Sequence, residues 1–171
     1  MDDTDGGTMP PTPSDLDAPA ARDWPEPRER ALRLWITLAR CYATYARAVA
    51  SKVQEYGLTT PQFGILEALY HLGPLSLGEL ADKMLVTGGN ITYVMDRLEE
   101  QGLVYRDRSP EDRRVIQAKL TGKGRELIAR VFPGHGEYIE MLSGHLSGGE
   151  QESLRVLLKK LGVAIMEGDL K

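Results

Sequence analysis

Apolar residues recur at helical spacing along most of the chain. The first series runs from Pro25 to about Tyr56 and stops at Gly57, a residue that favours a helix C-terminus. Five further helices are predicted to begin at small polar residues that can cap a first turn. These residues are Thr60, Ser76, Thr87, Thr121 and Ser147. The pattern predicts a mainly α-helical protein.

Some of these helix boundaries carry more specific signals. Thr60 is the expected N-cap of its helix, with Pro61 at the first helical position. The segments 76–79 (S-L-G-E) and 147–150 (S-G-G-E) have the spacing of a capping box. Pro133, followed by glycine, is expected to kink or interrupt the helix that starts at Thr121.

Between residues 103 and 121 the helical period is lost. Val104 to Arg106 and Val115 to Leu120 predict two short strands, joined by a turn at Ser109-Pro110-Glu111-Asp112. A helix that can enter a groove, followed by an arginine-rich hairpin, is the layout of a winged helix-turn-helix. Double-stranded DNA is therefore the leading candidate partner.

The pattern also suggests a division of the chain. Residues 1–24 are expected to form a disordered acidic, Pro-rich tail. Residues 58–121 form the predicted DNA-binding domain. Residues 25–57 and 122–171 form the predicted helical dimerisation region, because their apolar faces exceed what one small module can cover. An all-helical monomer that covers its own faces is the alternative.

Composition limits the classes of protein that remain. The chain has 171 residues, of which 42% are apolar, enough for one compact core. No run of about 18 apolar residues is present to span a membrane, and the acidic N-terminus is unlike a secretory leader. A cytoplasmic location is expected. The single cysteine, Cys41, excludes an internal disulfide and a cysteine-based metal cluster.

The net charge of −4 hides an uneven distribution. Residues 1–24 carry six acids against one base, whereas residues 103–130 carry eight bases against four acids. Phosphates respond to the local field, so the second segment fits a DNA partner. A solvated surface is the alternative interpretation of these bases. The overall acidity supports a different function, a winged-helix module that binds a protein and not DNA.

The helix predicted from residue 87 to 101 supplies candidate DNA contacts on its outward side. Glycines in its first turn permit close approach of the backbone to phosphate, although they also fit a loose helix start. Asn90 can pair with adenine, and Thr92 can contact base edges or a thymine methyl group. Tyr93 and Arg97 are better placed for phosphates. The full candidate set is Thr87, Gly88, Gly89, Asn90, Thr92, Tyr93 and Arg97.

The hairpin supplies the second set of candidate contacts. Arg114 is the predicted minor-groove arginine, because negative potential is concentrated in that groove. Asp112 lies two residues earlier and is expected to orient the guanidinium of Arg114. Arg113 and Arg108 are assigned to phosphates, and Arg106 completes the basic wing. The alternative for these charges is a surface ion pair of roughly 0–1 kcal/mol.

Several of these segments together resemble the MarR family of transcription factors. They are L-E-E-Q-G-L-V, R-S-P-E-D-R-R and L-T-G-K-G between Leu98 and Gly124, and L-T-x-x-Q-F between Leu58 and Phe63. The resemblance covers about residues 30 to 165, with the D-x-R triplet of the wing at 112–114. It implies a triangular homodimer with a winged helix at each lower corner. It further implies a pseudo-palindromic operator, usually repressed, and release of the DNA by a small molecule or oxidant.

Within that family, the runs 87–96 and 112–116 are most similar to the quinone- and aromatic-responsive branch. The resemblance therefore implies a phenolic or aromatic ligand, bound between the dimerisation helices and the winged helix. Aromatic residues at helical spacing also commonly form core, which is the competing interpretation. The candidate pocket residues are Trp35, Arg40, Tyr42, Tyr45, Phe63 and Tyr70.

Other signals are less favoured by the sequence. The peroxide-sensing branch has its cysteine at about the position of Trp35, so Cys41 is expected to be a small buried filler, with redox sensing as the alternative. Histidines with metal-ligand spacing are absent, so no metal is expected. Gly64 and Val94 stand where urate-responsive members have an acid and an arginine. The sequence has no motif of an enzyme and implies no cofactor.

Overall fold

The computed structural model describes residues 24–84, 88–108 and 115–168. The chain forms two compact units, Met1–Cys41 and Tyr42–Lys171. The assignment of residues 58–121 to DNA binding and of residues 25–57 and 122–171 to dimerisation concerns function and stays a prediction.

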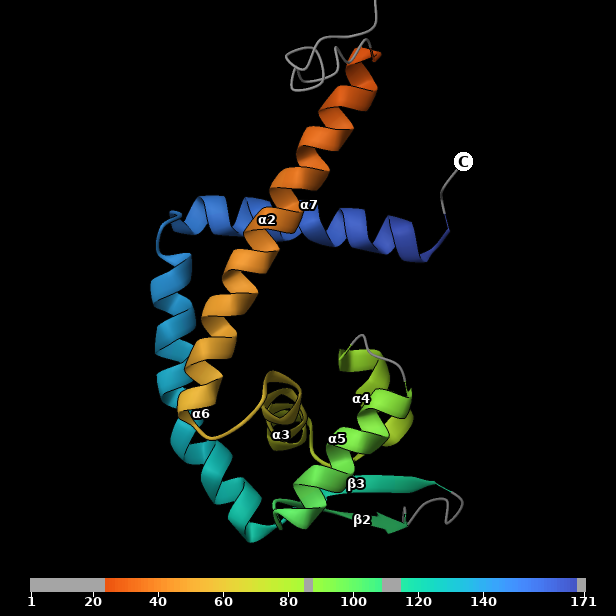
Figure 1. Ribbon diagram of the computed structural model, residues 1–171, viewed down its shortest axis with the longest axis vertical. Helices are drawn as coiled ribbons and strands as arrows, with labels where there is room; N and C mark the ends of the chain where they lie inside the picture. Colours follow the sequence, from red (N-terminus) through yellow and green to blue (C-terminus); the bar gives the residue numbers. More distant parts are fainter. Residues whose placement is uncertain (1–23, 85–87, 109–114, 169–171) are drawn as a thin grey trace, which may run out of the picture. The chain divides into compact units, whose positions relative to one another are not determined.

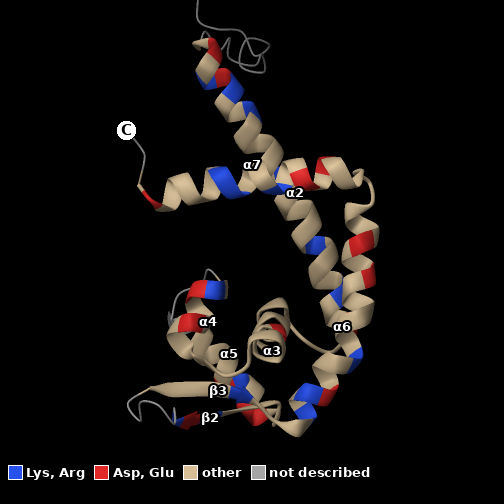
Figure 2. Ribbon diagram, turned by 180° about the vertical axis from the view of Figure 1, so that it is seen from behind, with Lys and Arg blue, Asp and Glu red and all other residues tan. Residues whose placement is uncertain are grey.

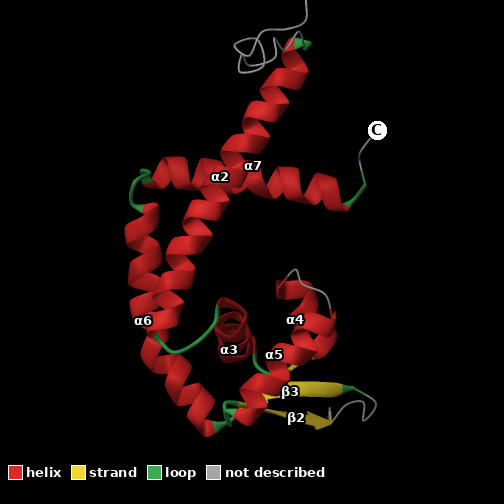
Figure 3. Ribbon diagram, in the orientation of Figure 1, coloured by secondary structure: helices red, strands yellow, loops and turns green. Residues whose placement is uncertain are grey.

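Helices dominate the described residues, with a small sheet among them (Figures 1 and 3). The helices are α2 (Glu26–Glu55), α3 (Thr60–Leu72), α4 (Leu77–Met84), α5 (Gly88–Glu100), α6 (Gly122–Ser143) and α7 (Gly148–Met166). The strands are β1 (Leu75–Ser76), β2 (Val104–Arg108) and β3 (Ile116–Leu120). The mainly α architecture with a β-hairpin wing is confirmed.

The sheet has the order β1-β3-β2, and both pairings are antiparallel. In the hairpin, Val104 pairs with Leu120 and Arg108 with Ile116. The two-residue strand β1 pairs Leu75 with Ala118 and was not predicted. Its second residue, Ser76, serves both as the end of that strand and as the cap of α4, and only the second role has a sequence signature.

The core lies where α3, α4 and α5 pack together over the sheet. The predicted inward side of α5 is confirmed, because Ile91, Val94, Met95 and Leu98 are all buried. Other fully buried side chains come from α3, α4 and α6, namely Ile65, Leu66, Leu80 and Ile128. This packing fixes one side of α5 and leaves its other side to solvent.

The helix caps follow the sequence with one correction. The N-cap of α3 is Thr59, not Thr60. Thr59 accepts a hydrogen bond from the backbone N–H of Gln62, and the Gln62 side chain accepts one from the backbone N–H of Thr59 at 2.9 Å. Only Thr59 has a glutamine three residues later to complete this reciprocal pair, so the helix begins one residue earlier than predicted.

Both predicted capping boxes are present. The Ser76 backbone donates to the Glu79 carboxylate at 2.7 Å, and the Ser147 backbone donates to the Glu150 carboxylate at 2.8 Å. Hydrogen bonds from the backbone and hydroxyl of Ser76 lower the pKa of Glu79, and hydrogen bonds from the hydroxyl and backbone of Ser147 lower the pKa of Glu150. Of the two outcomes expected at Pro133, a kink or an interruption, the interruption is wrong, because α6 runs unbroken past it. Figure 1 shows that α6 bends along its length, as a proline within a helix allows.

The start of α6 is held against the end of the α5–β2 connection. Thr121 caps α6 by accepting from the Gly124 backbone, and its hydroxyl donates to the Gly102 carbonyl at 2.7 Å. A Cβ added to Gly124 would lie 1.9 Å from the Leu103 carbonyl oxygen, so only glycine fits there. The segment L-T-G-K-G thus closes the wing onto α6.

The last helix, α7, has no buried residue in the single chain. Its large exposed apolar side chains are Leu154, Val156, Leu157, Leu158, Leu161, Val163, Ile165 and Met166. In the described part of the chain, no helix is both long and apolar enough to cross a membrane.

Candidate nucleic-acid interface

The outward side of α5 is the first part of the candidate interface. Thr92, Tyr93 and Arg97 are exposed, on the side opposite the buried apolar set. Gly88, Gly89 and Asn90 form the first described turn of the same helix. Thr87 lies outside the described residues, as do the contacts of the first-turn side chains. The structure therefore places three of the seven predicted contacts on an accessible helix face.

Two of these exposed side chains also contact each other. The Arg97 guanidinium lies over the Tyr93 ring, 5.4 Å from its centroid, and donates to the Glu100 carboxylate at 2.8 Å. Because both partners are exposed, the ion pair is weakly held and can exchange Glu100 for a phosphate. Tyr93 and Arg97 together form an aromatic and cationic surface that suits a DNA backbone.

The hairpin is the second part. Arg108 lies exposed at the end of β2, whereas Asp112, Arg113 and Arg114 lie outside the described residues. Lys119 of β3 donates to Asp107 of β2 at 2.8 Å. This ion pair lowers the pKa of Asp107, with a further contribution from the Arg108 backbone N–H, and raises the pKa of Lys119. The pair joins the two strands below the predicted minor-groove tip.

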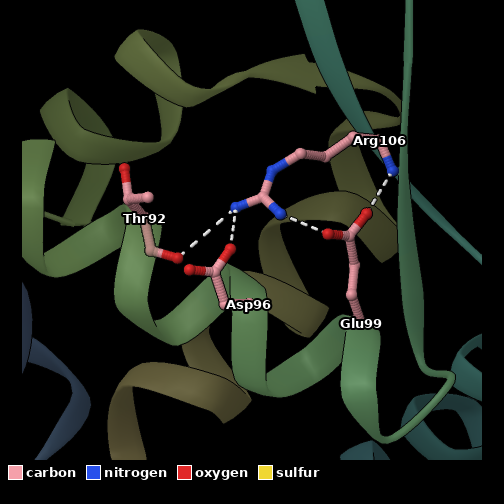
Figure 4. A network of polar contacts seen from close by, with 4 residues as sticks. All are labelled: Thr92, Asp96, Glu99 and Arg106. Atoms are coloured by element: carbon pink, nitrogen blue, oxygen red, sulfur yellow. Dashed lines mark hydrogen bonds and ion pairs between the residues drawn. The ribbon is translucent and has the colours of Figure 1, made fainter.

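Arg106 was predicted as a wing contact, and the structure places it against α5 (Figure 4). Its guanidinium pairs with Asp96 at 2.7 Å and with Glu99, and it also donates to the Thr92 carbonyl at 3.4 Å. The Arg106 backbone N–H donates to the second oxygen of Glu99 at 2.7 Å. Sequence reasoning missed both carboxylates, although their i,i+3 spacing places them on one side of α5.

Two other bases of the predicted patch also have protein partners. Lys123 donates to the Gln101 carbonyl at 2.8 Å, and Arg125 lies over the Tyr70 ring. Figure 2 shows acidic and basic segments intermixed around α5 and β2. The basic patch of the sequence is thus partly occupied in holding the winged helix together.

The predicted pocket residues have different environments. Phe63 is buried in the core, and Tyr70 is partly buried and packs against that core. Tyr42 is exposed, whereas Tyr45 is half-buried and its hydroxyl is 2.9 Å from that of Ser143. Trp35 and Arg40 belong to the N-terminal unit. The core interpretation is confirmed for Phe63, and the pocket stays a prediction.

Two polar atoms near Phe63 were not singled out from the sequence. Within the described residues, Tyr56 Oη and His135 Nδ1 are buried without a hydrogen-bond partner. The rings of Tyr56 and His135 lie 6.2 Å and 4.4 Å from the Phe63 ring. Burial lowers the pKa of His135, and nearby Glu67 opposes that shift. Buried polar groups normally have partners, so these two atoms stand out from the rest of the core.

Cys41 is exposed in the single chain, so the expectation of a buried filler is wrong. The reason lies in α2, where Val53 is the buried residue and most of the helix is open to solvent. Among the described residues, no group of three or more His, Cys, Asp or Glu side chains is placed to hold a metal ion.

The arrangement of α3, α4 and α5 on a sheet that ends in the β2–β3 hairpin defines a winged helix-turn-helix, a class of DNA-binding domain. Residues 58–116 match the model of the MarR family. The chain is 38% identical over 135 residues to the transcriptional regulator MhqR of Bacillus subtilis, covering 79% of this chain and 93% of that protein. The chain belongs to the MarR family.

Solved structures agree. A cysteine-to-serine mutant of Escherichia coli MarR, complexed with operator DNA, is similar with a TM-score of 0.70 and 25% identity, over 77% of this chain and 95% of that one. Bordetella bronchiseptica BpsR, whose DNA binding is regulated by 6-hydroxynicotinic acid, is similar with a TM-score of 0.67 and 26% identity, over 74% and 90%. The chain is therefore a DNA-binding transcriptional regulator and not an enzyme.

Proposed function

We propose that the chain is a homodimeric repressor that binds a pseudo-palindromic operator, with α5 in the major groove and the wing at the adjacent minor groove. The observation that carries this proposal is the accessible face of α5, where Thr92, Tyr93 and Arg97 are exposed while the opposite side is anchored in the core. Such a helix can enter a groove without any loss of packing.

The assignment of contacts within this interface follows the predicted chemistry. Asn90 and Thr92 face base edges, and Tyr93 and Arg97 face phosphates. Arg108 and Arg113 are assigned to phosphates of the DNA backbone. Arg114 is assigned to the minor groove, with Asp112 orienting its guanidinium.

The homodimer is supported by α7. In a lone chain, this 19-residue helix would expose eight large apolar side chains to water, which is unfavourable. A second copy supplies a matching face, as a two-fold operator also requires.

The DNA flanking the coding region of this protein provides the test. Fluorescence anisotropy should give nanomolar-range affinity for one palindrome in that DNA, and the affinity should fall steeply with salt because several phosphates are neutralised. Random DNA of equal length is the control. The absence of any salt-sensitive binding at micromolar protein would favour the alternative, a protein-interaction module, which the net charge of −4 supports.

The signal is proposed to be a small aromatic molecule with a polar substituent, such as a phenol or quinone. Its support is the pair of buried polar atoms, Tyr56 Oη and His135 Nδ1, beside the Phe63 ring. BpsR, which resembles this chain in fold, responds to a hydroxylated aromatic acid.

Salicylate and p-benzoquinone are suitable probes for release of the operator complex. Tyr56→Phe should bind the operator normally and require several-fold more of the active probe, because it removes only a hydroxyl. Equal release in both proteins would exclude this site. Because Cys41 is exposed, a cysteine-based redox regulator is the second candidate, and release by peroxide in the wild type but not in Cys41→Ser would support it.

A further inference from the structure

We propose that Arg106 is a positioning residue that locks the recognition helix α5 to the wing, so that the two contact DNA as one rigid body. In this role Arg106 itself does not contact a phosphate or a base. The inference rests on the proposed docking of α5 and the hairpin, and it adds a residue on which the specificity of that docking depends.

The geometry is that of a bridge between two elements. Arg106 extends from β2, and its partners Thr92, Asp96 and Glu99 all belong to α5 (Figure 4). These partners follow one another at intervals of four and three residues, which places them along one side of the helix. A single guanidinium therefore holds almost two turns of α5 against the strand.

Glu99 strengthens the bridge because it binds Arg106 twice. One carboxylate oxygen accepts from the guanidinium, and the other accepts from the Arg106 backbone N–H at 2.7 Å. The strand backbone is thus fixed to the helix together with the side chain. A planar fork of donors suits this task, whereas a lysine ammonium would not reach the same partners at once.

Arg106 is more buried than the charged side chains of α5 around it. Its side chain is 22% exposed, against 54% for Asp96 and 53% for Arg97. Arg106 is thus less open to solvent than the Asp96 carboxylate with which it pairs, and a phosphate would have to compete with Asp96 and Glu99 for its guanidinium. Arg97 is the more accessible of the two arginines.

The charges of the cluster also argue against a phosphate contact. One guanidinium faces two carboxylates, so one positive and two negative charges give the cluster a net charge of −1. The net negative charge of the cluster would repel a phosphate. What the cluster supplies is a fixed orientation of α5 relative to β2.

Positioning and phosphate contact predict different salt dependence. Removal of a phosphate contact weakens operator and random DNA alike and lowers the salt slope by about one. Loss of positioning weakens operator binding alone, because random DNA does not require correct registry with the bases. For Arg106→Ala we expect roughly two- to thirtyfold weaker operator binding. The salt slope should stay unchanged, and random-DNA affinity should fall much less than operator affinity.

Glu99→Ala is the sharper variant, because electrostatics and positioning predict opposite signs. Loss of a negative charge beside DNA should by itself tighten binding. Loss of the bridge should weaken operator binding. Glu100→Ala is the matched control, since it removes the same charge from the next residue of α5 but pairs with Arg97 and not with the wing. It should leave operator affinity unchanged or raise it.

Milder variants guard against misfolding. Arg106→Lys and Glu99→Gln each retain part of the bridge and should show smaller losses of operator affinity, with far-UV circular dichroism like the wild type. Arg106→Lys keeps its charge and should also bind random DNA like the wild type. A salt slope reduced by about one in Arg106→Ala, or tighter operator binding by Glu99→Ala, would overturn the proposal. If the wild type itself does not prefer the operator to random DNA, the proposed function fails and not the bridge.

Discussion

In the junction between the wing and α6, Gly124 lies directly against the backbone of Leu103. A methyl group there would meet the Leu103 carbonyl oxygen at 1.9 Å, and backbone atoms cannot move aside as a flexible side chain can. The junction also holds the cap of α6, so any displacement costs hydrogen bonds as well as packing.

Gly124→Ala is therefore expected to lower the free energy of unfolding by about 2 kcal/mol or more. Gly122→Ala is the control, because nothing lies within 4 Å of an added Cβ at that position, and alanine there should be neutral or stabilising. Urea unfolding followed by circular dichroism measures both. Equal stability of the two variants would contradict the close approach.

His135 should make stability depend on pH. Burial lowers its pKa below the ordinary 6.5, so the folded chain favours the neutral imidazole more than the unfolded chain does. The unfolded chain takes up a proton near pH 6.5. The contribution of His135 to stability is therefore complete above about pH 6.5 and is lost as the pH falls from there toward the folded pKa.

The comparison of urea midpoints at pH 7.5 and 5.5 tests this expectation. The wild type should lose more stability between the two pH values than His135→Phe, which keeps an aromatic ring beside Phe63 but cannot titrate. A pH dependence that is unchanged in the variant would show that other groups cause it.

At the scale of residues, the sequence predicts the role of a side chain where its partners lie close to it along the chain. The capping boxes and the inward side of α5 follow from fixed spacings, and the structure confirms them. Arg106 could not be assigned from spacing, because its partners lie on a different element. An arginine in a hairpin has the same appearance in the sequence whether it faces DNA or a carboxylate.

At the scale of elements, the exposed side of α5 is the part that makes the chemistry of DNA binding testable. Arg97 is expected to exchange Glu100 for a phosphate when the helix enters the groove. Arg97→Ala should weaken binding to operator and random DNA by a similar factor, and it should lower the slope of log affinity against log salt by about one.

Arg30→Ala is a suitable control, because Arg30 also forms an exposed helical ion pair, with Glu26 at 2.8 Å, but lies outside the winged helix. It should leave the slope unchanged. An Arg97 variant with the wild-type slope would remove this residue from the interface.

Elements were predictable where their periodicity was long. Helices α2 and α5, of 30 and 13 residues, have clear apolar periodicity, whereas β1 has two residues and exists only because β3 offers it a pairing edge. Pro133 does not interrupt α6, because packing of α6 against α3 offsets the one helical hydrogen bond that a proline removes, and the bend of α6 (Figure 1) agrees with the kink, the other expected outcome.

At the scale of the whole molecule, α7 is the element that the single chain leaves incomplete. Leu157→Glu places a charge at a side chain that is 63% exposed in one chain and should be covered in the proposed dimer. Sedimentation equilibrium should show two copies for the wild type and a shift toward one copy for the variant, with weaker operator binding.

Leu72→Glu is the control, because it alters a similarly exposed leucine on α3. This variant should sediment with the same assembly mass as the wild type. A monomeric wild type at micromolar concentration would contradict the proposed homodimer.

The unburied face of α7 has a consequence for gene dosage. If two copies must meet before either can read the operator, the concentration of active repressor rises with the square of the free chain concentration at low levels. Halving the synthesis of the chain then reduces operator occupancy by more than half. A cell could thus convert a modest change in expression of this regulator into a sharp change at its target promoter.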